Sequence, residues 1–282
     1  MSLIALIIAL ILERTRHYQS RWLWQDVTHR WFSWLPCRHS LSWLALGVGL
    51  PTIFIAIVQW FVRGWLFGSV SFVLWITIPL LILGCPQLQK SFREYLRDSI
   101  EDPQQACQIF NQQLDVIYPG CASQPLDSLE QTSRFLCWIN FRYYFSVIFW
   151  FSLGGPFLAM SYGLLRSLHR WAIENSQSGC SVDMLTRLLH WIDWIPVRLS
   201  TFSFVVCAGS ASGFKVWLHS LRDVHHANAD WLGQVGAECR ERHEEKPITY
   251  NQMMMATVYL LKSSILLTLV IIALFTLYGW LV

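Results

Sequence analysis

The stretch LSWLALGVGLPTIFIAIVQWFV, residues 41–62, contains no charged side chain and decides the class of fold. As a helix it extends about 33 Å, which is enough to cross the roughly 30 Å hydrocarbon core of a bilayer. A second apolar stretch, residues 66–84, follows after only Arg63, Gly64 and one further residue. The two stretches therefore predict a tight hairpin of membrane-spanning helices.

The composition of the whole chain agrees with a membrane protein. Of its 282 residues 54% are hydrophobic and 14% are charged, whereas soluble domains carry about 25% charged residues. The 16 tryptophans are typical of chains that meet the membrane–water interface. A net charge of +3 without a Lys/Arg run argues against nucleic-acid binding. The eight cysteines form no C-x-x-C pair, so no metal site or redox pair is predicted.

The remaining apolar segments differ in strength. We predict an all-α, polytopic protein with four confident spans at 41–62, 66–84, about 135–165 and 263–282. Residues 1–12 are short for a span and predict a short or partly inserted helix. Residues 189–211 are marginal, because Asp193 and Arg198 each oppose insertion by about 3 kcal/mol.

Residues 15–36 alternate aromatic and basic side chains. Trp24, Val27, Trp31 and Trp34 recur at helical spacing on one face. Two interpretations fit this pattern equally: a helix lying in the membrane interface, or an ordinary helix packed on the membrane helices.

Local signals mark helix starts and one helix break. Asp102-Pro103 is typical of a helix N-terminus, and Ser128 followed by Gln131 resembles a capping box. Gly154-Gly155-Pro156 interrupts the third apolar region and predicts either a broken helix or a simple kink.

The distribution of Lys and Arg predicts the orientation. Segment 13–40 holds five arginines and segment 212–262 holds six Lys/Arg, so both are expected in the cytoplasm of a multi-pass inner-membrane protein. Five segments follow: an N-terminal helix, interfacial helix and hairpin (1–84), a cytoplasmic helical loop (85–134), a broken membrane helix with a polar intramembrane segment (135–211), a cytoplasmic helical segment (212–262) and a C-terminal span (263–282).

The segment DWIPVRL, residues 193–199, is the first candidate for function. Ionisable residues at membrane depth are unfavourable and usually face the protein interior or a water-filled cavity. We predict that Asp193 and Arg198 neutralise each other, either as a structural ion pair or as a site in which the guanidinium binds an anionic ligand. Pro196 also frees the carbonyl of Ile192 from helical bonding.

Two further polar segments are candidates for function. The segment RDVHHANADW, residues 222–231, has adjacent histidines, but His225 and His226 would point about 100° apart on a helix, so metal binding is not favoured. In the segment WINFR, residues 138–142, Asn140 and Arg142 either face a cavity or extend to the headgroups. The predicted ligand-binding residues are Asn140, Arg142, Gly154, Gly155, Asp193, Arg198, Arg222, Asp223 and Asn228, with no catalytic residue, no metal ligand and no cofactor assigned.

The motifs of these segments resemble the AmpE family, inner-membrane proteins encoded beside the AmpD amidase and associated with β-lactamase regulation. The resemblance covers the whole chain and rests on WINFRYY (138–144), Phe149-Trp150, Gly154-Gly155, Tyr162, IDWIPVRL (192–199) and YGWLV (278–282). It implies a signalling modulator of β-lactamase induction and of the response to cell-wall stress and antibiotics. A cytoplasmic partner such as the AmpD amidase is a further implication.

The chain is more distantly similar to the membrane-bound adenosylcobinamide-phosphate synthase family. PVRL (196–199) corresponds to its Pro-Ala-Arg-Leu motif and NADW (228–231) to its Asn-Ala-Gly-Trp motif. The synthase has Glu-Asn and Asn-Thr-Leu-Asp segments where this chain has Ile139-Asn140 and LRSL (165–168), so the acids expected to hold a metal or transfer protons are missing.

Three functions are therefore weighed. We expect a non-enzymatic modulator that senses an anionic ligand or a partner through a polar cleft. The alternative is a divergent membrane-bound synthase or transferase. A transporter would require inverted repeats, and the sequence contains no convincing repeat.

Overall fold

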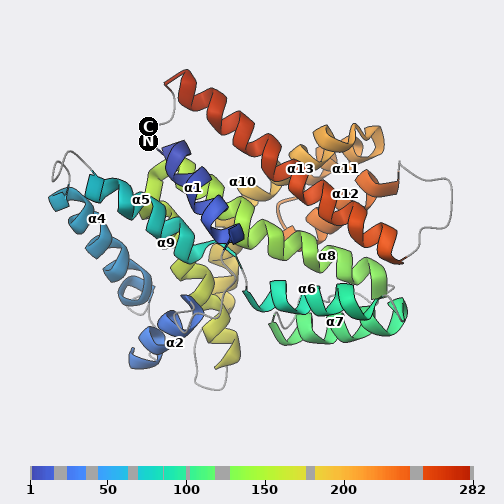
Figure 1. The fold of residues 1–282 in the computed structure, drawn as a ribbon, viewed down its shortest axis with the longest axis horizontal. Helices are drawn as coiled ribbons and strands as arrows, with labels where there is room; N and C mark the ends of the chain where they lie inside the picture. Colours follow the sequence, from blue (N-terminus) through green and yellow to red (C-terminus); the bar gives the residue numbers. More distant parts are fainter. Residues whose placement is uncertain are drawn as a thin grey trace. The chain divides into compact units, whose positions relative to one another are not determined.

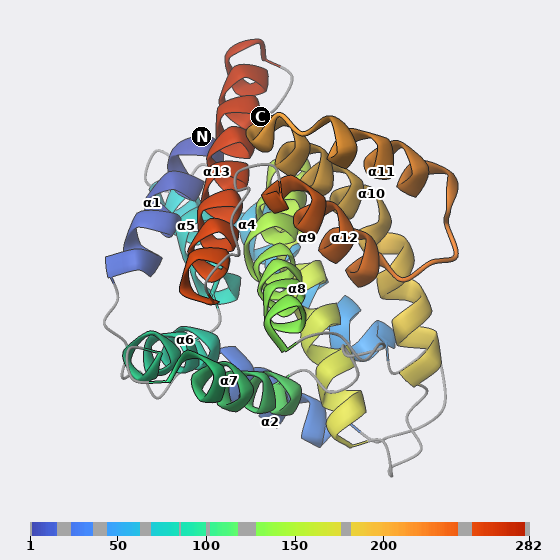
Figure 2. The same ribbon diagram turned by 90° about the vertical axis from the view of Figure 1, so that its right-hand side faces the viewer.

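The computed structural model describes residues 2–15, 24–35, 44–62, 69–84, 86–99, 102–117, 128–175, 182–241 and 250–279. Every regular element in these residues is helical (Figures 1 and 2), which confirms the predicted fold class. The elements are α1 (Ser2–Thr15), α2 (Trp24–Trp34), the π-helical turn η1 (Ala45–Gly49), α4 (Leu50–Val62), α5 (Ser69–Ile82), α6 (Pro86–Asp98), α7 (Pro103–Ile117), α8 (Ser128–Asn140), the π-helical turn η3 (Phe141–Phe145), α9 (Ser146–Glu174), α10 (Val182–Ala208), α11 (Ala211–Arg222), α12 (Asn228–Glu241) and α13 (Tyr250–Leu277).

The chain forms two compact units. Unit 1 comprises Met1–Gly84, Ser146–Trp191 and Ile272–Val282, and unit 2 comprises Cys85–Phe145 and Ile192–Ile271. Helices α10 and α13 each contribute residues to both units.

Four helical stretches in the described residues are long and apolar enough to cross a membrane. They are Ala45–Val62, Leu129–Glu174, Val182–Ala208 and Gln252–Leu277. Residues 189–208 of the marginal segment 189–211 are therefore part of a helix of full spanning length, which ends at Ala208. Helix α5 has 14 residues and covers Ser69–Ile82 of the predicted span at 66–84, while residues 66–68 lie outside the described part of the chain. The predicted turn at Arg63-Gly64 lies outside the described residues.

Unit 1 is built on close contact between α1, α5 and α9, which lie side by side in Figures 1 and 2. Gly163 on α9 permits this approach, since a Cβ there would lie 2.7 Å from Cγ2 of Ile82 on α5. The guanidinium of Arg166 donates to the carbonyl oxygen of Ile82 at 3.2 Å, where α5 ends and its last carbonyls lack intrahelical partners.

Helix α9 is interrupted at the predicted position. Gly154 has φ −141° and ψ 24°, and Gly155 has φ 61° and ψ −151°, so neither residue is helical. Glycine is required at position 155 for two reasons. Its positive φ is unfavourable for other residues, and an added Cβ would lie 3.0 Å from Cη2 of Trp75. The backbone thus kinks here, and α9 consists of two helical parts that meet at the two glycines.

Replacing Gly155 with alanine should destabilise the chain by about 1–3 kcal/mol, because alanine would be strained at this φ and would press on Trp75. Equilibrium unfolding in mixed micelles measures the change. Gly49→Ala is the matched control, since a Cβ at Gly49 meets nothing within 4 Å and should be neutral or slightly stabilising. Equal effects of the two substitutions would contradict the strain at Gly155.

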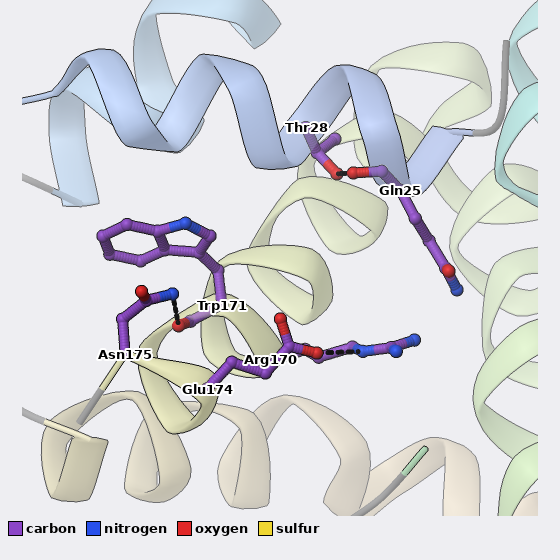
Figure 3. A network of polar contacts seen from close by, with 6 residues as sticks. All are labelled: Gln25, Thr28, Arg170, Trp171, Glu174 and Asn175. Atoms are coloured by element: carbon purple, nitrogen blue, oxygen red, sulfur yellow. Dashed lines mark hydrogen bonds and ion pairs between the residues drawn. The ribbon is translucent and has the colours of Figure 1, made fainter. Parts of the chain in front are cut away.

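Helix α2 packs on α9, which supports the packed-helix interpretation of residues 15–36. The Trp24 indole donates to Ser167 at 2.9 Å, and the ring of Phe32 lies 6.4 Å from that of Trp171. Figure 3 shows Trp171 pointing from α9 toward α2, above the hydrogen bond from Asn175 to its carbonyl. Of the four residues that recur on one face, Val27, Trp31 and Trp34 are exposed, Trp34 to 86%.

Unit 2 contains α6, α7 and α8 around an aromatic cluster of Phe92, Tyr95 and Phe110. Figures 1 and 2 show α6 and α7 side by side. The predicted start of α7 is confirmed, because Oδ1 of Asp102 accepts from the backbone N–H groups of Gln104 and Gln105 at 3.0 and 3.2 Å.

The early start of α13 and the packing of α8 on α12 are two further features of unit 2. Helix α13 begins at Tyr250, well before the predicted span at 263, because Met254, Thr257 and Leu261 form a buried stripe along its first turns. Helix α8 packs tightly on α12, where a Cβ at Gly233 would lie 2.6 Å from Cγ of Arg134.

Candidate functional site

Helix α10 carries the acid and the arginine of the DWIPVRL segment into the interior of unit 2. Asp193 is 1% exposed and Arg198 is 3% exposed, so both are buried as expected. Their predicted mutual pairing is wrong, however. Five residues along a helix turn the direction by about 140° after one full revolution, which points the two side chains toward different neighbours.

Asp193 pairs with Arg142 of the π-helical turn η3. Nη2 of Arg142 lies 3.6 Å from Oδ2 of Asp193, and the arginine is 7% exposed. The guanidinium carbon of Arg142 also lies 4.8 Å from the ring centre of Trp138, one helical turn earlier. Both partners belong to stretches of spanning length, so each offsets the other's desolvation.

Arg198 joins the end of α11 to the start of α12. Its Nη2 donates to the carbonyl oxygens of Ser220 at 3.1 Å and Asp223 at 3.0 Å, and its Nη1 donates to Oδ1 of Asn228. The carbonyls at a helix C-terminus lack intrahelical partners and favour a cation. One guanidinium therefore holds the connection between α11 and α12, which lie side by side in Figure 2.

Arg142 and Arg198 share a cation–π contact that the sequence interpretation missed. The guanidinium carbon of Arg198 lies 4.9 Å from the ring centre of Trp194, four residues earlier, as Arg142 lies over Trp138. Residues four apart share a helix face, so the repeated Trp-x-x-x-Arg spacing was a readable signal. No sequence pattern could identify Ser220 as an acceptor for Arg198, because Ser220 accepts through its backbone carbonyl.

The other predicted ligand-binding residues lie in different parts of the fold. Asn140 is half-buried at the end of α8, and Arg222 is exposed at the end of α11. Gly154 and Gly155 lie in unit 1, at the break in α9. The structure thus groups Arg142 with Asp193, and Arg198 with Asn228 and the backbone of Asp223.

The carboxylate of Asp223 organises the turn before α12. Its Oδ1 accepts from the backbone N–H groups of His225 at 3.0 Å and His226 at 3.1 Å. The hydrogen bond from His226 is the largest cause that holds the pKa of Asp223 below its usual value. Nε2 of His226 lies 3.6 Å from Oδ2 of Asp230. Both His225 and His226 therefore make contacts that stabilise the turn before α12.

The described residues form a helical fold with four stretches of spanning length, in which Arg142 and Arg198 are buried and held by polar partners, and this defines an integral membrane protein with a polar interior. The particular family follows from comparison: the chain belongs to the AmpE family, described as regulatory signalling modulator proteins, whose pattern matches residues 1–282. It is 27% identical over 257 residues to Protein AmpE of Shigella flexneri, covering 86% of this chain and 85% of that protein. No solved structure matches the chain.

Proposed function

We propose that this chain is a multi-pass inner-membrane protein that senses an anionic ligand or a partner and modulates the response linking cell-wall stress to β-lactamase expression. The family's description as a regulatory signalling modulator supports the general role. We assign the sensing step to Arg198 and to the residues through which it connects α11 to α12.

One observation carries the sensing step. Arg198 uses Nη1 and Nη2 to hold Ser220, Asp223 and Asn228, while its Nε is buried without a hydrogen-bond acceptor in the described part of the chain. A carboxylate or phosphate binds a guanidinium through two parallel hydrogen bonds. Such a ligand at Nε and Nη2 would compete with the carbonyls of Ser220 and Asp223 for the same donor.

The competition gives two states of the connection between α11 and α12. In one state Arg198 fixes the connection, and in the other the ligand holds Arg198 and releases it. A ligand can shift this equilibrium only by the difference in its affinity for the two states. Segment 212–262, predicted to be cytoplasmic, would then present a changed surface to a partner such as the AmpD amidase.

The test weakens the fixed state without touching Arg198. Asn228→Ala removes one hydrogen bond to a charged group, so the released state should become about tenfold more populated. Hydrogen exchange of residues 219–231 in the purified chain should rise accordingly. β-Lactamase induction should change in cells that carry the variant as their sole copy.

The matched control is Asn175→Ala in unit 1, where the side chain donates to the carbonyl of Trp171 in the preceding turn. It should leave exchange at 219–231 and induction unchanged. Unaltered induction with Asn228→Ala, despite faster exchange, would refute the link between this connection and signalling.

A further inference from the structure

Arg240 is a buried cation that the residues discussed above do not involve. It lies near the end of α12 and is 6% exposed. Its Nη1 donates to the hydroxyl of Thr257 on α13 at 3.1 Å. Its Nε and Nη2 are buried with no hydrogen-bond acceptor within the described ranges, and no ion pair found there includes it.

The two unbonded nitrogens are the ones that act together. Nε and Nη2 form one edge of the guanidinium plane, and their N–H bonds point in the same direction. This edge matches two oxygens of a carboxylate or a phosphate. A buried charge without a counter-charge is unfavourable, so an anion on this edge would remove the penalty.

A second guanidinium lies near the same thiol as Arg240. The Cys137 thiol on α8 lies within side-chain hydrogen-bonding reach of Arg240 on α12, and Arg134 on α8 interacts with this thiol electrostatically. Nη2 of Arg134 pairs with Glu130 at 2.8 Å, while its Nε is also buried without an acceptor in the described residues. Arg134 thus has a carboxylate partner in Glu130, whereas no ion pair of Arg240 is found among the described residues.

The neighbouring thiol on α12 does not supply the missing negative charge. Burial raises the pKa of Cys239 to about 12, so this thiol is neutral at pH 7. The described residues thus supply no anion to the guanidinium edge of Arg240.

The depth of the site points to a phosphate. Thr257 lies within the first two turns of the spanning stretch Gln252–Leu277, whose 26 residues extend about 39 Å as a helix. This length exceeds the roughly 30 Å hydrocarbon core, so the first turns are expected at the level of the lipid headgroups. Basic pockets between helices at this level bind phosphate-bearing headgroups.

We propose that Arg240, together with Arg134, binds a phosphate group where α8, α12 and α13 meet the membrane boundary. The site is separate from the sensing residues around Arg198 and goes beyond the function proposed for them. The phosphate belongs either to an anionic phospholipid or to a soluble phosphate compound.

The experiment uses the full chain, purified in detergent and freed of bound lipid. Native mass spectrometry with added phosphatidylglycerol or phosphatidylcholine tests the lipid source. Thermal unfolding in sodium phosphate and in sodium chloride of equal ionic strength tests the soluble source. We expect selective binding of phosphatidylglycerol or stabilisation by phosphate, weakened about 10- to 100-fold in Arg240→Met.

Arg93→Met is the matched control, because Arg93 is an exposed arginine on α6. It should bind phosphate as the unaltered chain does. If Arg240→Met fails to fold, hydrogen exchange of the unaltered chain decides instead, with slower exchange at residues 236–241 and 253–257 expected on adding the phosphate ligand. The proposal is overturned if neither source binds, or if Arg240→Met binds as tightly as Arg93→Met.

Discussion

Replacing Asp193 with asparagine is expected to destabilise the folded chain by about 3–5 kcal/mol, because the change removes the carboxylate that faces the buried guanidinium of Arg142. The charge of Arg142 would remain at membrane depth without that neutralising partner, 3.6 Å away in the unaltered chain. Equilibrium unfolding in mixed micelles gives the free energy of unfolding.

Two comparisons make this prediction specific. Asp98→Asn is the matched control, because Asp98 pairs with Arg97 at the surface and such pairs contribute only about 0–1 kcal/mol. The double variant Asp193→Leu/Arg142→Met should recover most of the lost stability, since it replaces the whole pair with apolar side chains of similar volume. An Asp193→Asn variant as stable as Asp98→Asn would show that the pair carries no stabilising charge interaction.

The sequence predicted those features of the fold that depend on local patterns. Apolar stretches identified three of the four stretches of spanning length, Asp102 identified the start of α7, and Gly154-Gly155 identified the kink in α9. Each of these signals lies within a few residues of the structure that it specifies. The family assignment is confirmed across the whole chain.

Features that depend on distant residues could not be predicted in the same way. The partner of Asp193 is Arg142, 51 positions earlier, and one sequence does not show which helices pack together. Sequence proximity instead favoured Arg198, although helical geometry points it elsewhere. The long start of α13 was missed because Thr257 and Met254 are buried by contacts within unit 2 that no local hydropathy reveals.

The candidate site shows the same division. The sequence identified buried ionisable residues, because their presence in apolar segments is itself the signal. It did not identify what Arg198 holds, because two of its acceptors are backbone carbonyls that any residue type would supply. Arg240 was missed because it lies outside every apolar segment and becomes buried only when α12 packs against α8 and α13.

Replacing Arg198 with methionine should destabilise the chain by about 3–5 kcal/mol and release the connection between α11 and α12. The substitution leaves Oδ1 of Asn228 and the carbonyls of Ser220 and Asp223 without their common donor. Arg198→Lys should have an intermediate effect, because a single ammonium cannot reproduce the planar set of donors. Unfolding in mixed micelles measures the loss.

Hydrogen exchange distinguishes a local role from a general one. Residues 220–228 should exchange much faster in Arg198→Met, whereas α6 and α7 should be protected as in the unaltered chain, because their aromatic cluster does not involve Arg198. Arg222→Gln, an exposed arginine beside the same turn, should change stability by no more than about 0.5 kcal/mol. If Arg198→Met instead loosened α6 and α7 as much as residues 220–228, Arg198 would support unit 2 as a whole, and the α11–α12 connection would not be the element that a competing anion releases.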